Sequence, residues 1–223
     1  MDNPSPSSVL IAIDGPAASG KSTVARTLAA RLGYEYVNSG GFYRAVTWFV
    51  LEQGVDPNDS PAVADLLERA RVNCYLRAGA SVIEFDGVDP EPFLRETRIN
   101  SYVSTVASIP EIRAGLTGKL RDLAGGLNTV MEGRDIGSAV FPHTPYKFYI
   151  DASPEVRAQR RQAQEGGGPQ HDQILARDHT DSTRRTSPLV IAEDAFVIDS
   201  SRLTIDGVVG EVIGRLKLKG LTA

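Results

Sequence analysis

The chain has 223 residues, of which 41% are hydrophobic and 23% charged, and its formal net charge is -4. This length suits one domain that carries insertions, and the composition is typical of a globular protein with a sizeable core. The acidic balance argues against a general binder of nucleic-acid polymers or anionic membranes, so any positive site has to be local. The single cysteine, Cys74, excludes an internal disulfide.

Residues 1–8 have neither the basic segment nor the apolar segment of a secretion signal. The chain also has no apolar run of about 18 residues, the length that a membrane-spanning helix needs. We therefore expect a flexible leader over residues 1–8, a cytoplasmic location and no membrane partner.

A strand, a loop and a helix are predicted at the start of the chain. Residues 9–13 are continuously apolar, as in a buried strand, and Val24, Leu28 and Leu32 share one face of a helix that starts at Lys21. The turn between them fits G-x-x-x-x-G-K-[ST], whose backbone N–H groups close around phosphate oxygens. Lys21 would reach the β- and γ-phosphates, and the Ser22 hydroxyl would bind Mg²⁺. The predicted nucleotide-binding residues are Gly15, Pro16, Ala17, Ala18, Ser19, Gly20, Lys21, Ser22 and Thr23.

Strands and helices alternate through the rest of the chain. Strands are expected at 34–37, 129–131, 146–150 and 195–198, and helices at 42–51, 96–107 and 110–123, with others starting at Ser60, Ser153 and Thr204. This order predicts an α/β fold with a parallel sheet covered on both faces. Residues 72–76 and 82–85 are predicted to form a small antiparallel unit inserted between parallel strands.

Polar residues follow several predicted strands. Ligands bind beyond the carboxyl ends of parallel strands, where 15–22, 38–44 and 132–135 should converge. Arginine forks suit phosphate oxygens, and Arg134 is the strongest candidate because it directly follows a strand. Further arginines that could serve a phosphoryl-transfer site are Arg44, Arg95, Arg113, Arg157, Arg160, Arg161, Arg177, Arg184 and Arg185.

Five motifs occur in order and cover nearly the whole chain. They are IDGPAASGKST (13–23), SGGFYRA (39–45), EGRDIGSAVFP (132–142), KFYIDASPEVRAQRR (147–161) and RDHTDSTRRTSPL (177–189). With these motifs the chain resembles bacterial cytidylate kinases, members of the nucleoside monophosphate kinase group. The insertion at 63–98 is itself a feature of the bacterial type.

The resemblance implies direct in-line transfer of the γ-phosphoryl group of ATP, with Mg²⁺, to CMP or dCMP, giving ADP and CDP or dCDP. It also implies a P-loop kinase fold with a five-stranded parallel sheet. The core would comprise 9–62, 99–164 and 188–223, with a monophosphate-binding insertion at 63–98 and an arginine-rich lid at 165–187. The expected partners are small molecules, with no nucleic-acid polymer, and the protein is expected to be monomeric.

Site roles carry over by the same resemblance. Ser39, Tyr43 and Arg44 would line the acceptor site, and Ser104, Arg113 and Asp135 would recognise the cytosine edge. Arg134 would bind the acceptor phosphate, and Asp181 with Arg184 the sugar and phosphate. Arg160 and Arg177 would touch the transferring phosphates from the lid. The implied catalytic residues are Lys21, Arg134, Arg160, Arg177 and Arg184.

The chain departs from the family pattern at two places. Asn38 stands where the family commonly has aspartate, and the stretch from Arg161 to Arg177 is short, with glycines at 166–168. Asn38 would soften an orienting contact in the acceptor site. The short stretch bears on where Arg160 and Arg177 lie.

Three alternatives remain open at this point. Another nucleoside monophosphate kinase, for UMP and CMP, or a shikimate-type kinase would share the phosphate loop, but neither explains the 132–142 and 177–189 motifs together. A nucleotide-binding switch without acceptor chemistry would not need Ser39, Tyr43 and Arg44. A non-catalytic interaction protein would not need Lys21 and Ser22.

Overall fold

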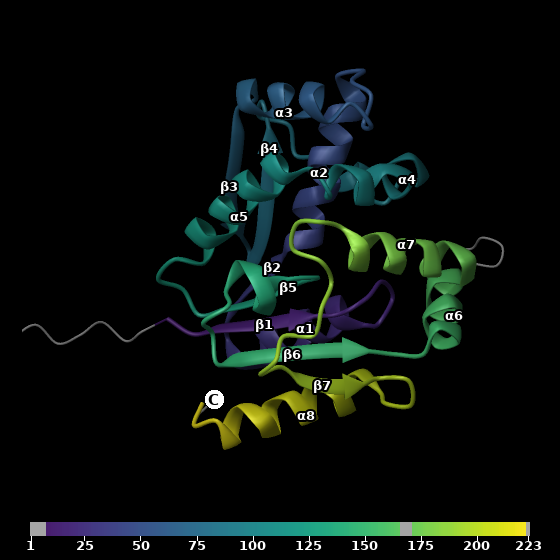
Figure 1. Cartoon of the computed structure of the whole chain (residues 1–223). Helices are drawn as coiled ribbons and strands as arrows, with labels where there is room; N and C mark the ends of the chain where they lie inside the picture. The colour runs from purple at the N-terminus through teal and green to yellow at the C-terminus, as the bar shows by residue number, and fades with distance from the viewer. Residues whose placement is uncertain (1–7, 166–170, 222–223) are drawn as a thin grey trace, which may run out of the picture.

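The computed structural model describes residues 8–165 and 171–221. Most of the predicted leader and the glycines at 166–168 lie outside these residues. Within the described ranges the chain forms one seven-stranded sheet in the order β3-β4-β2-β5-β1-β6-β7 (Figure 1). The strands are β1 (Leu10–Asp14), β2 (Glu35–Asn38), β3 (Val72–Arg77), β4 (Ala80–Phe85), β5 (Thr129–Gly133), β6 (Tyr146–Asp151) and β7 (Phe196–Asp199).

Helices cover both faces of the sheet, which confirms the predicted α/β fold. On one face, α1 packs beside α8, with the apolar side chains of Ile11, Ile13 and Phe148 beneath them. The other face, which includes Ala12 and Met131, lies in the cluster formed with α2, α4 and α5. The helices are α1 (Lys21–Leu32), α2 (Ser39–Glu52), α3 (Ser60–Arg69), η1 (Glu91–Phe93), α4 (Thr97–Val106), α5 (Pro110–Ala124), η2 (Ile136–Val140), α6 (Pro154–Glu165), α7 (His171–Thr183) and α8 (Ile205–Leu218).

The predicted count of five strands was wrong, because the antiparallel hairpin extends the sheet. The strands β2, β5, β1, β6 and β7 are parallel neighbours, as expected. The hairpin β3-β4 joins the edge of β2, where Tyr36 pairs with Ala80 and the Tyr36 N–H donates to the Gly79 carbonyl at 3.0 Å. The Asn38 N–H also donates to Ser81 Oγ at 3.1 Å. The hairpin thereby covers backbone groups that an unpaired edge strand would expose.

One helix cap and one helix start differ from the predicted ones. The cap of α3 is Asp59, whose carboxylate accepts from the Ala62 N–H at 3.1 Å, and Ser60 is already inside the helix. The helix α2 begins at Ser39, three residues before the predicted 42, because Asn38 caps it and accepts from the Gly41 N–H. Thr204 caps α8 as predicted, with its hydroxyl accepting from the Gly207 N–H.

The helices α6 and α7 lie beyond the carboxyl ends of β1 and β6, where the arrowheads in Figure 1 point. The parallel strands and the start of α1 therefore face these two helices across the predicted ligand-binding edge. In the described part of the chain, no helix combines the length and the apolar character needed to cross a membrane.

Candidate active site

One cavity lies at the carboxyl ends of the parallel strands and combines the phosphate loop with residues predicted for the acceptor site. Its lining comes from the loop before α1 and from β5, α2, α4, α5, α6 and α7. Of the residues selected from the sequence, it contains Ala17, Ala18, Gly20, Lys21, Ser22, Thr23, Ser39, Tyr43, Arg44, Ser104, Arg113, Arg134, Asp135, Arg177, Asp181 and Arg184. The cavity therefore brings together segments that are more than 100 residues apart in the chain.

The conformation of the phosphate loop depends on glycine at two places. Gly20, at the N-terminus of α1, has a φ of 91°, in the region that favours glycine. At Gly15, whose φ is 151°, an added Cβ would lie 2.1 Å from the carbonyl oxygen of Ile150 in β6. Any side chain at position 15 would therefore push the loop away from the sheet. The Ser19 hydroxyl is buried and has no hydrogen-bond partner among the described residues.

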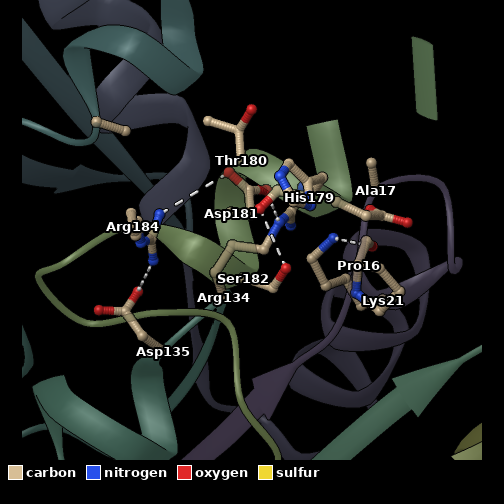
Figure 2. A network of polar contacts seen from close by, with 12 residues as sticks. Pro16, Ala17, Lys21, Arg134, Asp135, His179, Thr180, Asp181, Ser182 and Arg184 are labelled. Carbon is tan, nitrogen blue, oxygen red and sulfur yellow. Dashed lines mark hydrogen bonds and ion pairs between the residues drawn. The ribbon is translucent and has the colours of Figure 1, made fainter. Parts of the chain in front are cut away.

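Lys21 is the buried cation of the phosphate loop. It is 6% exposed, and its Nζ donates to the Pro16 carbonyl at 3.0 Å (Figure 2). Burial, and then the positive charge of Arg134, lowers the pKa of this ammonium to about 7. Glu132 and Asp181 oppose this shift only in part, and a polyphosphate in the cavity would add negative charge beside Lys21.

Ser22 and Glu132 form an oxygen pair at the same end of the cavity. The Ser22 hydroxyl donates to Glu132 Oε1 at 2.8 Å, and the Tyr36 hydroxyl reaches the same oxygen at 3.4 Å. Hydroxyl and carboxylate oxygens are the ligands that Mg²⁺ prefers, usually with waters and substrate phosphates completing its shell. The pair therefore fits a magnesium ion carried in by a nucleotide. The sequence places Glu132 within the segment 132–135 that is predicted at this edge, but it gives Glu132 no role of its own.

The residues predicted for the acceptor site include a chain of alternating charges. Arg113 forms a buried ion pair with Asp135, and Arg184 Nη2 lies 3.5 Å from the other Asp135 oxygen. Arg184 in turn lies 3.9 Å from Asp181, which accepts from Arg134 Nε at 2.9 Å. Figure 2 shows Arg184 between the two carboxylates. Burial raises the pKa of Asp181, but Arg134 and Arg177 outweigh it and hold that pKa below its ordinary value.

Cations outnumber carboxylates around the cavity. Arg177 Nε has no hydrogen-bond partner in the part of the chain that the structure describes, and burial together with the charges of Arg134 and Arg44 lowers the pKa of Arg177 to about 9. The cations that line the cavity are Lys21, Arg44, Arg113, Arg134, Arg161, Arg177 and Arg184, against the carboxylates Glu132, Asp135 and Asp181. In a protein of net charge -4, this local excess of positive charge points to an anionic ligand.

Arg160 lies outside the lining of this cavity. Its guanidinium donates to the Ser19 carbonyl at 3.1 Å and to the Ser200 carbonyl at 2.7 Å, so it links the phosphate loop to the end of β7. The next residue, Arg161, lines the cavity instead. Gly15, Pro16 and Ser19 belong to the phosphate loop but not to the lining. The one-residue difference between Arg160 and Arg161 depends on the rotation of α6, which the motif does not specify.

Asn38 fills the role of a helix cap. Its Oδ1 accepts from the Gly41 N–H at 3.1 Å, an interaction that an aspartate would make in the same way. The same residue lines the cavity beside Ser39 and Gly40. The Ser39 hydroxyl donates to the Glu132 carbonyl at 2.8 Å, which joins the start of α2 to the end of β5.

Comparisons with known proteins identify chains that are similar over nearly the whole sequence. A cytidylate kinase of Corynebacterium efficiens is 43% identical over 213 residues, which cover 92% of this chain and 93% of that protein. A bifunctional pantoate ligase/cytidylate kinase of Synechococcus sp. is 44% identical over 213 residues, covering 91% of this chain and 43% of that protein.

A solved structure of an uncharacterized protein from Eubacterium ventriosum aligns with a TM-score of 0.50 at 12% identity, covering 94% of this chain and 98% of that one, and bears on the fold alone. The family model for cytidylate kinase matches residues 11–218, nearly all of the chain that the structure describes. The chain belongs to the cytidylate kinase family.

Proposed function

We propose that the protein transfers the γ-phosphoryl group of ATP to CMP or dCMP. The observation that carries the proposal is that a phosphate loop and the charge network of Arg113, Asp135, Arg184 and Asp181 line one and the same cavity. A nucleotide switch needs the loop alone, whereas a kinase needs a donor and an acceptor in one enclosed space. The proposed partners are therefore small-molecule nucleotides.

The donor side would be held by the phosphate loop and Lys21. Backbone N–H groups of the loop and the start of α1 would bind the β- and γ-phosphates, with Lys21 beside them. Mg²⁺ held near Ser22 and Glu132 would neutralise part of the phosphate charge. Phosphoryl transfer requires little covalent chemistry from the protein, so positioning and charge stabilisation would carry the rate. We expect no covalent phosphoenzyme.

The acceptor side would read the base through Asp135 and Arg113. Cytosine presents an amino donor beside acceptor atoms, and these match a carboxylate and a guanidinium. Uracil presents a carbonyl where cytosine has its amino group, so Asp135 would face an acceptor and lose its hydrogen bond. Ser104 lines the cavity from α4 and would contact the same base edge.

The lid would supply charge through Arg161 and Arg177 instead of through Arg160. Both of these arginines line the cavity, one from α6 and one from α7. Arg160 would support the phosphate loop from behind, through its bonds to Ser19 and Ser200. Closure of the lid would exclude water that otherwise hydrolyses ATP.

The first test offers CMP, dCMP, UMP, AMP, GMP and shikimate separately with ATP and Mg²⁺, and measures ADP production. We expect rapid turnover with CMP and dCMP and little with the others. Lys21→Ala should lower this turnover by at least about a hundredfold, since one charge-stabilising contact is lost. Stoichiometric ATP binding with no acceptor-stimulated ADP would contradict the proposal and favour a nucleotide switch.

Replacing Asp135 by asparagine tests base recognition. The amide keeps the size of the side chain but can donate to the uracil carbonyl, so the ratio of kcat/KM for CMP over UMP should fall by about tenfold or more. Asp122→Asn, an exposed carboxylate on α5, is the control and should leave the ratio unchanged. If Asp135→Asn kept the wild-type ratio of kcat/KM for CMP over UMP, Asp135 would have no role in base recognition.

We predict different kinetic defects for substitutions of the two neighbouring arginines of α6, Arg160 and Arg161. Arg161→Met should lower kcat by about a hundredfold, because it removes a cation from the cavity. Arg160→Met should raise the KM for ATP and lower Tm, with kcat within about threefold, because its contacts are to backbone carbonyls behind the loop. An equal loss of kcat in Arg160→Met would contradict this assignment and would mean that Arg160 itself stabilises charge on the transferring phosphates.

We predict that the Lys21 amine takes up a proton when ATP binds. With a pKa of about 7 in the ligand-free protein, the amine is mostly neutral at pH 8, and the added phosphates should raise its pKa and protonate it. Calorimetry at pH 8 in buffers of different ionisation enthalpy should therefore detect uptake of about one proton per ATP. The uptake should decline toward pH 6, where Lys21 already carries its proton. Lys21→Arg, which is charged at both pH values, should abolish it, and uptake retained in that variant would disprove the assignment.

A further inference from the structure

We propose that Asp14 is a positioning residue for the acceptor, holding the segment Arg134-Asp135 at the angle that CMP binding requires. The inference rests on the proposed function and adds a residue that does not itself touch the ligand. Asp14 is the last residue of β1 and is 5% exposed.

Both carboxylate oxygens of Asp14 accept hydrogen bonds from the same backbone turn. Oδ1 accepts from the Ile136 N–H and Oδ2 from the Gly137 N–H, each at 2.7 Å. These amides open η2, directly after the Arg134-Asp135 pair. From the other side, the Asp135 carbonyl accepts from the N–H groups of Ala139 and Val140 at 2.9 and 3.0 Å. The backbone of Asp135 is therefore fixed at both ends of the turn.

The Asp14 carboxylate packs closely against the turn at Gly137. A Cβ added to Gly137 would lie 3.3 Å from Asp14 Oδ2 and 3.1 Å from the stem of Lys147. Burial raises the pKa of Asp14 to about 7, although the two N–H donors oppose the shift. A buried carboxylate is costly, and an asparagine would offer one acceptor oxygen where two donors converge. The turn thus requires the carboxylate that the sequence supplies.

The position of Asp14 in the chain links the two substrates. The next residue, Gly15, begins the phosphate loop and lies against Ile150, so the end of β1 is fixed on the donor side. The same strand end holds the acceptor turn through the Asp14 carboxylate. A displaced turn would move Arg134, which faces the acceptor phosphate, together with Asp135, which faces the base. Loss of Asp14 should therefore weaken CMP binding more than ATP binding.

The test measures KM for both substrates and the Kd for CMP alone, at pH 8, in Asp14→Asn. We expect KM and Kd for CMP to rise about tenfold, the effect of one lost hydrogen bond to a charged group, with KM for ATP within about twofold. The control is Arg121→Met. Arg121 donates to the Val140 and Ala139 carbonyls at the far end of η2, so its loss should lower Tm and leave the CMP constants within about twofold.

A second variant addresses the same contact without changing charge. Gly137→Ala should crowd Asp14 Oδ2 and raise KM for CMP several-fold, and it remains informative if Asp14→Asn does not fold. Equal changes in both KM values, or an unchanged Kd for CMP in folded variants, would overturn the role of Asp14. Failure of the wild type to phosphorylate CMP would instead overturn the proposed function, so the two failures are distinguishable.

Discussion

Repulsion among the cations of the cavity is the constraint on which the rest of the site depends. Lys21 and Arg177 both have pKa values well below the ordinary ones, because burial and neighbouring positive charge disfavour their charged forms. The structure relieves the repulsion by placing Asp135 and Asp181 between arginines, so that each carboxylate serves two guanidinium groups. The remaining excess of positive charge is what an anionic substrate would neutralise.

This arrangement of charges links the folding stability of the protein to ligand binding in the cavity. A ligand that binds only the folded protein stabilises it by mass action, and here the ligand would also remove part of the repulsion that burial imposes. Arg113 is an example of a buried cation that depends on a carboxylate partner. It is 2% exposed, pairs with Asp135 and lies over the ring of Tyr43 at 5.2 Å, so it would be a buried unpaired charge if the carboxylate were absent. The residues that would recognise the base are thus also residues that stabilise the fold around the cavity.

The sequence predicted the parallel strands and the phosphate loop because these depend on local patterns. Residues 9–13 form an apolar run, and the loop glycines follow it directly, so no long-range information was needed. The pairing of Tyr36 with Ala80 depends on which strand edge lies next to which hairpin, and no local pattern carries that information.

The site shows the same limit at the level of single residues. The motif at 147–161 runs into α6 and contains both Arg160 and Arg161, and only the rotation of the helix decides which one faces the cavity. Glu132 lies in the segment 132–135 that the sequence places at the predicted ligand-binding edge, but no local pattern assigns it a role. Its pairing with Ser22 joins residues 110 positions apart and could not be read from either segment alone.

The helix α7 is attached to the site largely through charge. Asp178 accepts from Arg157 at 2.5 Å and Asp181 from Arg134 at 2.9 Å, and the three-residue spacing places both carboxylates on one side of the helix. Arg134 contacts Asp181 through Nε alone among its described hydrogen bonds, and a guanidinium has four further N–H donors. An acceptor phosphate could therefore bind Arg134 without breaking the ion pair that holds α7. The same arginine would then join the acceptor to the helix that carries Arg177, so that acceptor binding and lid position depend on one side chain.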